Sequence, residues 1–261
     1  MNKTSKFTTV LICALLLAGC AGTQNRHTDP VNDPWEGFNR KAFAFNDSMD
    51  RNVLRPIAVG YDKIMPDPLQ RGVGNFFRNF DAPVTFINLL LQGEFEKSAD
   101  TFGRFLLNST VGLLGFFDLA TKAGVAYYDE DLGQTLAAWG YKDSRYLVLP
   151  VFGPSTPRDG VGRYADSFIN PVGRQIHIQD HWGYWLVRGI DFRAQFLSRD
   201  GQLGEAFDPY VLMRDVWMQN RAFQIYDGDP PAADYDLYME DAFREHIYLK
   251  DSTTTKPDPE E

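Results

Sequence analysis

Cysteine is nearly absent from this sequence of 261 residues, and its two copies, Cys13 and Cys20, both lie close to the N-terminus. The remaining chain therefore has no disulfide, no thiolate metal site and no cysteine nucleophile. Basic side chains are also few, with 26 lysines and arginines against 35 acids and a net charge of −9. Because these bases form no positive stripe, nucleic acid is not expected as a partner.

Motifs of hydrolytic enzymes are absent as well. No Gly-x-Ser-x-Gly elbow occurs, and Ser155 in GPSTP lies between prolines rather than in a tight turn of small residues. His177 and His181 are spaced for one helical face, but HIQDH lacks the glutamate of the zincin motif. We therefore expect no catalytic residues and no bound metal. A lipid hydrolase stays as a weaker alternative for the function.

The two hydrophobic runs that stand out in the body are too short to cross a bilayer. Residues 82–93 read APVTFINLLLQG and residues 105–117 read FLLNSTVGLLGFF, both without a charge. As helix, the longer run rises about 20 Å, against a hydrocarbon core of about 30 Å. Their apolar side chains point to more than one helix face, so protein or lipid must enclose them. They are either core helices or segments sunk into one leaflet, with Arg104 and Asp118 marking where water begins.

The first nineteen residues are typical of a targeting segment. Lys3 and Lys6 precede an apolar stretch, and residues 17–20 read LAGC. Small residues directly before a cysteine resemble the bacterial lipobox, which predicts that Cys20 carries a lipid; an ordinary secretory signal is the alternative. Ala21 is not the aspartate that retains such lipoproteins at the inner membrane. We expect a lipid anchor at the periplasmic face of the outer membrane.

Composition divides the rest of the chain into three parts. Residues 20–32 are polar and without a periodic pattern, which predicts a flexible tether. Residues 33–227 carry the periodic hydrophobic patterns of a folded domain. Residues 228–261 are rich in acids, which predicts a partly disordered tail.

Helical periodicity dominates residues 33–227. Asp33, Pro34 and Glu36 have the spacing of a capping box, and an apolar stripe follows it. That stripe consists of Trp35, Phe38, Ala42, Phe45 and Met49. Similar patterns predict helices over residues 69–80, 95–106, 132–136 and 182–197, the last capped by Asp180, and from Asp208 to before Gly228. Only residues 146–153 read as extended. The predicted fold class is mainly α, with little or no sheet.

Five segments together resemble the VacJ/MlaA family of lipoproteins. They are DPWEGFNRKAFAFNDSMD, NFFRNFDAPVTFINLLLQGEF, FGRFLLNSTVGLLGFFDLA, YLVLPVFGPSTPRDGVG and DPYVLMRDVWMQNRAF. The resemblance implies a ring-like assembly of amphipathic helices seated in one leaflet of the outer membrane. It further implies removal of misplaced outer-leaflet phospholipids through a central amphipathic channel, a soluble periplasmic lipid carrier as acceptor, and trimeric porins as membrane partners. No cofactor is implied.

A path for a phospholipid needs polar residues beside the headgroup and apolar residues beside the acyl chains. Placing the headgroup in hydrocarbon, or the acyl chains in water, costs free energy. Both kinds of residue meet around the second hydrophobic run. The predicted channel or rim residues are Phe105, Leu106, Asn108, Ser109, Thr110, Leu113, Leu114, Phe116 and Phe117. Leu89, Leu90 and Leu91 are predicted to contact lipid. The alternative is that Asn-Ser-Thr caps a turn between two helices.

The first predicted helix carries a further candidate set. Phe43, Phe45 and Asn46 lie in FAFN, within a helix that resembles the family's channel-adjacent helix. Core packing is the alternative for Phe45, since it belongs to the apolar stripe. A structural lipoprotein that brings porins together is a second alternative function, because the same helices and tether would serve it.

Overall fold

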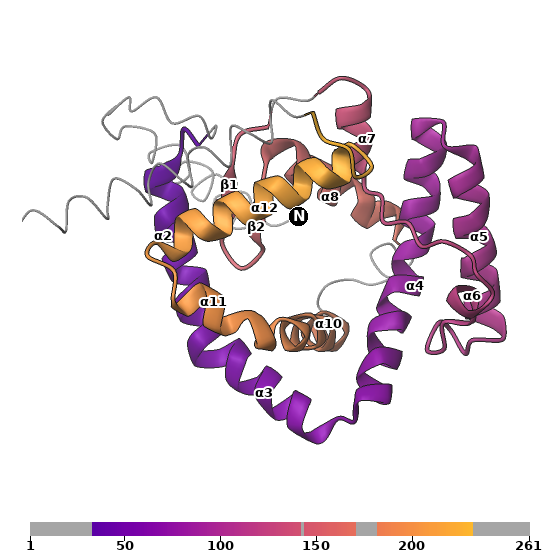
Figure 1. Cartoon of the computed structure of the whole chain (residues 1–261), viewed down its shortest axis with the longest axis horizontal. Helices are drawn as coiled ribbons and strands as arrows, with labels where there is room; N and C mark the ends of the chain where they lie inside the picture. Colours follow the sequence, from indigo (N-terminus) through magenta and orange to yellow (C-terminus); the bar gives the residue numbers. More distant parts are fainter. Residues whose placement is uncertain (1–32, 142–143, 171–181, 232–261) are drawn as a thin grey trace, which may run out of the picture.

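The computed structural model describes residues 33–141, 144–170 and 182–231, except for the side chains of Gln202 and Leu203. Figure 1 shows that these residues form a ring of helices around a central space. Cys20, Asp180, His177 and His181 lie outside the described residues, as do residues 1–32 and 232–261. Within the described ranges, no helix combines the length and the hydropathy that a membrane crossing requires.

The described secondary structure is almost entirely helical, which confirms the predicted fold class. The helices are α2 (Glu36–Met49), a π-helical turn (Asp50–Leu54), α3 (Arg55–Ile64), α4 (Asp67–Gln92), α5 (Phe95–Thr110), α6 (Leu119–Lys122), α7 (Leu132–Ala138), α8 (Pro157–Ile169), α10 (Trp182–Gln195), a 3₁₀ turn (Leu197–Arg199), α11 (Asp200–Gly204) and α12 (Pro209–Ile225). The strands are β1 (Leu147–Leu149) and β2 (Gly153–Ser155).

Local signals explain several helix ends. The Asp208 side chain accepts hydrogen bonds from the backbone amides of Tyr210 and Val211, so it caps α12 as predicted. Gly93 ends α4 in a left-handed conformation, with φ of 83°. The helix predicted over residues 69–80 and the first hydrophobic run are one element, α4, which continues through Pro83.

The expected capping box before α2 is not formed. Asp33 gives no side-chain cap, and the residue before the helix is Trp35. Instead the Asp33 carboxylate accepts hydrogen bonds from Asn39, at 2.7 Å, and from the hydroxyl of Tyr210. This prediction is wrong because Tyr210 competes for the carboxylate from a helix far along the chain.

A small apolar core joins α2, the β-hairpin and α12. Its buried members are Ala42, Tyr146, Val148, Tyr210 and Met218, with Phe43, Val211 and Trp217 packed against them. β1 and β2 are antiparallel, with Val148 opposite Pro154. The segment predicted as extended, residues 146–153, is therefore confirmed only in β1, because the chain turns at residues 150–152. Asn39 donates to the carbonyl of Tyr146 and accepts from the amide of Val148, which fixes the hairpin to α2. We call this cluster the aromatic core.

Elsewhere the usual distribution of polarity is reversed. Among the buried residues of the described chain, 21 are polar or charged and 12 are hydrophobic. Large hydrophobic side chains are instead exposed on most helices. Phe38 and Phe45 lie outward on α2, so the core-packing alternative for Phe45 is wrong. Apolar residues on this scale exceed the scattered exposure of a soluble monomer and indicate a nonaqueous neighbour.

Candidate functional site

The helix α5 shows the reversed polarity most clearly. Its buried residues are Ser98, Thr101, Arg104 and Asn108, which recur three or four positions apart and so share one face. The outward face carries Phe95, Phe102 and Leu106, and Phe95 is 70% exposed. A helix of this kind has the orientation expected when protein lies on the polar side and hydrocarbon on the apolar side.

The second hydrophobic run is only partly helical. After α5 ends at Thr110, the chain forms a compact loop in which Leu113 and Leu114 have positive φ values of 53° and 58°. Both leucine side chains are exposed, Leu113 to 65%. A side chain on Gly115 would approach the Asn79 side chain to 2.3 Å, which explains a glycine there. The expectation of an all-round apolar helix is therefore wrong for residues 111–117.

The Asn-Ser-Thr segment serves the turn between α5 and α6. Asn108 is buried, accepts hydrogen bonds from the amides of Leu119 and Ala120, and donates to Asp118. Ser109 accepts a hydrogen bond from Asn79 at 2.8 Å. Thr110 is exposed, and its hydroxyl donates to a carbonyl within α5. Asn108 therefore caps the turn, as the alternative interpretation proposed. Its side chain also lines the pocket described below.

The remaining candidate residues divide between exterior and interior. Leu90, Leu91, Leu106 and Phe117 are exposed on the outside of the hairpin formed by α4 and α5. Leu89 is only 1% exposed. Its predicted lipid contact is therefore wrong, because it lies on the inner face of α4.

Three further candidates lie against protein. Phe105 lines the pocket described below. Phe116 packs on Gly72, where a side chain would approach the ring to 2.3 Å. Asn46 donates to the carbonyl of Leu149 and accepts from the amide of Val151.

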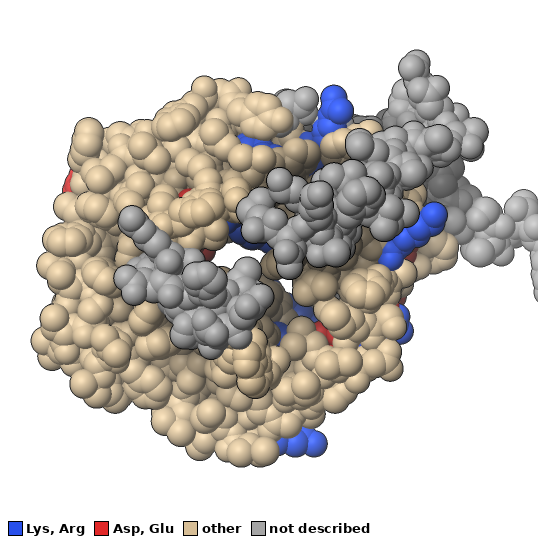
Figure 2. All heavy atoms as spheres, turned by 180° about the vertical axis from the view of Figure 1, so that it is seen from behind, with Lys and Arg blue, Asp and Glu red and all other residues tan. Residues whose placement is uncertain are grey.

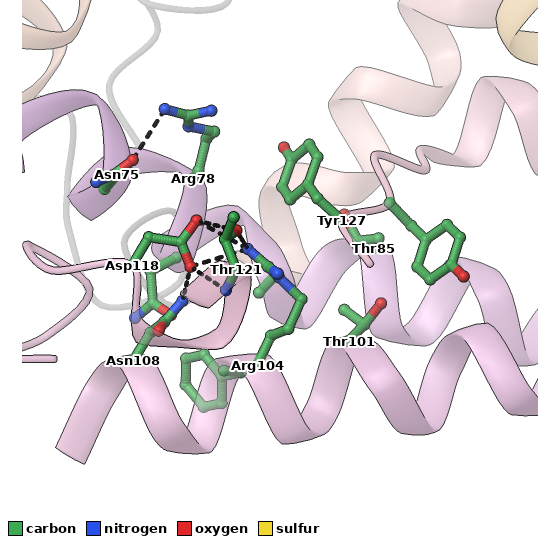
Figure 3. A pocket seen from close by; sticks show the side chains of 13 residues that line it. Asn75, Arg78, Thr85, Thr101, Arg104, Asn108, Asp118, Thr121 and Tyr127 are labelled. Atoms are coloured by element: carbon green, nitrogen blue, oxygen red, sulfur yellow. Dashed lines mark hydrogen bonds and ion pairs between the residues drawn. The ribbon is translucent and has the colours of Figure 1, made fainter. Parts of the chain in front are cut away.

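A polar pocket of about 130 Å³ lies between α4, α5, α6 and the segment before α7 (Figure 3). It is lined by Asn75, Arg78, Asn79, Ala82, Thr85, Thr101, Arg104, Phe105, Asn108, Asp118, Thr121, Tyr127 and Tyr128. The sequence analysis had singled out Phe105, Asn108, Arg104 and Asp118 among these, and it had missed the rest.

Arg104 organises one side of this pocket. Its guanidinium lies 3.0 Å from both carboxylate oxygens of Asp118 and 3.0 Å from the hydroxyl of Thr121. Burial alone would raise the pKa of Asp118, but hydrogen bonds from Thr121 and Asn108 and the charge of Arg104 lower it. Arg104 and Asp118 therefore form an internal ion pair and do not mark a water boundary, which corrects that expectation.

Ion pairs also join neighbouring elements around the ring. Arg188 of α10 binds Asp81 of α4 through two contacts of 2.6 and 2.9 Å. Arg221 of α12 contacts Asp131 and Asp159 at 2.7 and 2.8 Å. Two further pairs are Arg193 with Asp50 and Arg55 with Asp200. These ion pairs join elements that are far apart in the sequence, such as α4 with α10 and α7 with α12.

Figure 2 shows an opening that passes through the ring. Charged atoms are visible near this opening and at a few places along the edge, whereas most of the face seen in this view carries no charge. Among residues 33–141, 144–170 and 182–231, no group of histidine, cysteine, aspartate or glutamate is arranged to hold a metal ion.

Comparisons with known proteins agree with this geometry. The MlaA lipoprotein family matches residues 31–224. A Haemophilus influenzae protein is 34% identical over 236 residues, covering 87% of this chain and 92% of the relative. An Escherichia coli protein is 36% identical over 220 residues, covering 82% and 86%. Both relatives are named intermembrane phospholipid transport system lipoprotein MlaA.

A solved structure adds the evidence for the fold. It was described as the structural basis for maintenance of bacterial outer membrane lipid asymmetry, and it is 35% identical to this chain. The two superpose with a TM-score of 0.67, covering 74% of this chain and 98% of that one. Sequence and fold therefore agree over most of the molecule, and this chain belongs to the MlaA lipoprotein family.

Proposed function

We propose that this protein is the outer-membrane component of an intermembrane phospholipid transport system. It removes phospholipids misplaced in the outer leaflet through the central opening and so maintains the lipid asymmetry of that membrane. The names of the relatives and the subject of the similar solved structure support the pathway. The observation that carries the mechanism is the reversed polarity, with many charged and polar side chains buried and many large hydrophobic side chains exposed.

This distribution matches the energetics of moving a lipid between leaflets. A polar headgroup left unsatisfied in hydrocarbon costs several kcal/mol, whereas exposing each acyl methylene to water costs about 0.8 kcal/mol. A passage with polar walls lowers the first cost. Exposed apolar residues on the outside keep the protein in the leaflet at the depth where the misplaced lipid lies.

The outward leucines and phenylalanines are proposed to seat the ring in the periplasmic leaflet. Leu90, Leu91, Leu106, Leu114 and Phe117 support this through their exposure on the α4–α5 hairpin and the loop that follows it. Leu113 belongs to the same surface. A lipid on Cys20 is proposed to anchor the chain to this leaflet, through residues 20–32 as a tether.

Two protein partners complete the proposal. A soluble periplasmic carrier would accept the lipid, which the word "intermembrane" in the names of the relatives supports. Trimeric porins would surround the ring in the membrane; their support is the resemblance of the sequence motifs to the VacJ/MlaA family. The exposed aromatic residues Tyr164 and Phe168 of α8 and Trp182 of α10 offer surface for such contacts.

The test is an exchange assay with the full-length protein in proteoliposomes that carry a labelled phospholipid. Protein-free liposomes are the control, and the products are identified by mass spectrometry. Transfer of intact phospholipid to acceptor vesicles beyond the control supports the proposal. Release of free fatty acid would indicate the hydrolase alternative, and the absence of both products would indicate a scaffold.

A further inference from the structure

Six arginines that are buried or half-buried have carboxylate partners. Within the described residues, the pairs are Arg104 with Asp118, Arg158 with Asp159, Arg188 with Asp81, Arg193 with Asp50 and Asp200, Arg214 with Asp215, and Arg221 with Asp131 and Asp159. Arg78 of α4 is exposed, lines the pocket, and has no ion pair in the part of the chain that the structure describes. Its guanidinium donates one hydrogen bond, to Asn75 at 2.9 Å.

Arg78 leaves the pocket with an unbalanced positive charge. The charged side chains of the lining are Arg78, Arg104 and Asp118. Since Arg104 and Asp118 neutralise each other, the net charge is 2 − 1 = +1 and resides on Arg78. Arg78 is exposed and has no ion pair, so its charge is available to an anion that enters the pocket.

A carboxylate that could compete is Asp191 of α10, which forms no ion pair with Arg78. It accepts hydrogen bonds from Tyr61, at 2.9 Å, and from Gln195, at 2.9 Å. Burial raises the pKa of Asp191, and Arg78 contributes only a smaller, opposing effect through its charge. Asp191 is thus held by neutral partners and does not neutralise Arg78.

The surroundings of Arg78 suit a phosphate group. Figure 3 shows Arg78 beside Tyr127, whose ring centre lies 6.0 Å from the guanidinium carbon, and away from the Arg104–Asp118 pair. Burial raises the pKa of Tyr127, so its hydroxyl stays protonated and can donate a hydrogen bond. The amides of Asn75 and Asn79 add further donors at the wall. A planar guanidinium binds two phosphate oxygens at once, and charge-assisted hydrogen bonds of this kind are strong.

The pocket has room for a phosphate group, since its volume is about 130 Å³. The apolar ring of Phe105 also lines the pocket, beside the hydrophobic loop that contains Leu113 and Leu114.

We propose that Arg78, with Asn75 and Tyr127, binds the phosphodiester group of a phospholipid during its passage, while the acyl chains stay outside the pocket. This assignment rests on the proposed function and adds a specific headgroup site to it. Because the phosphodiester is common to phospholipids, the site would select for phosphate and not for the attached alcohol.

The experiment measures binding of two fluorescent lipids with identical acyl chains to the full-length protein in detergent. One lipid is phosphatidylglycerol, and the other is diacylglycerol, which lacks phosphate. Arg78→Gln is expected to weaken phosphatidylglycerol binding about tenfold, and Arg78→Lys about threefold, since lysine keeps the charge but loses the two-pronged geometry. Diacylglycerol binding should stay unchanged. Arg71→Gln is the matched control, because Arg71 is an exposed arginine of the same helix outside the pocket.

Three results would overturn the assignment, and a fourth concerns the function itself. Equal loss of both lipids in Arg78→Gln, or no loss of either, would remove the phosphate site. Full displacement of labelled phosphatidylglycerol by inorganic phosphate would mean that the site serves free phosphate. Wild-type protein that binds neither lipid would instead contradict the proposed function.

Discussion

The aromatic core and the α4–α5 hairpin solve the same folding problem in opposite ways. In the aromatic core, Tyr146, Val148 and Tyr210 are buried, as in a soluble protein. In the hairpin, Arg104 and Asn108 are buried, while Phe102 points outward. The aromatic core is stabilised by the burial of apolar side chains. The α4–α5 hairpin exposes its apolar side chains, as expected for a surface in contact with lipid, and its buried polar side chains are paired by hydrogen bonds and ion pairs.

The two strategies respond differently to substitution. Removing an apolar side chain from the aromatic core leaves a cavity, and the surrounding side chains relax only partly. Removing one polar partner from the hairpin leaves the other buried and unsatisfied. Removing an outward apolar side chain should matter for membrane seating and little for folding. The following four predictions separate these cases, all measured as unfolding free energies in detergent.

The largest effect is expected in the aromatic core. Tyr146 is fully buried, so Tyr146→Ala should lower the unfolding free energy by about 3–5 kcal/mol. Tyr146→Phe is the control that keeps the ring, and it should be nearly neutral because the hydroxyl has no hydrogen-bond partner among the described residues. Phe102→Ala on the outside of α5 should change stability by no more than about 0.5 kcal/mol. A similar loss at Phe102 would remove the contrast between the regions.

Breaking the internal ion pair of the hairpin should have the next largest effect. Arg104→Met leaves Asp118 without its cation and should cost about 3 kcal/mol, at the lower end for buried pairs because Asp118 is partly exposed. Adding Asp118→Leu should recover part of this loss, since both charges are then gone. If the double variant is as unstable as the sum of the single ones, the pair does not act as a unit.

Two glycines test the close packing of the loop after α5. Gly115 has φ of 93° and faces Asn79, so Gly115→Ala should cost about 2–3 kcal/mol through backbone strain and overcrowding. Gly103 lies within α5 with open space around it. Gly103→Ala should therefore stabilise the protein by up to about 1 kcal/mol. Equal effects at the two sites would contradict the described loop geometry.

The smallest effect concerns the buried acid Glu130, which accepts a hydrogen bond from Gln92. Burial raises the pKa of Glu130 to about 7 from the ordinary 4.5, so the folded state binds this proton more tightly than the unfolded state. Lowering the pH from 7 to 4.5 should thus stabilise the protein.

Glu130→Gln cannot titrate and should remove this pH dependence. At pH above 7 the variant should be more stable than the wild type by about 1–2 kcal/mol, below the limit set by 1.36 kcal/mol per pKa unit. The advantage should vanish as the pH falls below 4.5. Identical pH profiles for variant and wild type would show that Glu130 is solvated like an ordinary glutamate.

Much of the secondary structure was predictable because its signals are local. The start of α12 follows from Asp208, and the periodicity of residues 95–106 identifies α5. The helices α3 (Arg55–Ile64) and α8 (Pro157–Ile169) were missed, although their apolar residues recur at a helical spacing, as Val161, Tyr164 and Phe168 do. The capping box predicted at Asp33 was wrong because the Asp33 carboxylate accepts a hydrogen bond from the hydroxyl of Tyr210, which lies 177 positions away in the sequence.

Periodicity identified faces but not the solvent that each face meets. The stripe containing Phe38 and Phe45 suggested a core, although these two side chains are exposed and Ala42 is the member that is buried. The better signal was the polar stripe of α5, where Ser98, Thr101 and Arg104 recur at a helical spacing. Arg78 had no local signal, because its place in the pocket wall and its lack of an ion pair depend on elements far apart in the sequence.

The central claim is that the outward face of α5 lies in hydrocarbon while the pocket lies in water. Residues 33–227 contain no cysteine. A cysteine introduced at Phe102, Leu114 or Tyr127 can therefore carry a spin label that reports on that one position of the domain in the membrane-bound protein. Accessibility to oxygen, which concentrates in lipid, should be high at Phe102 and Leu114, and accessibility to a polar nickel reagent should be high at Tyr127. Equal access of the nickel reagent to all three positions would contradict the account.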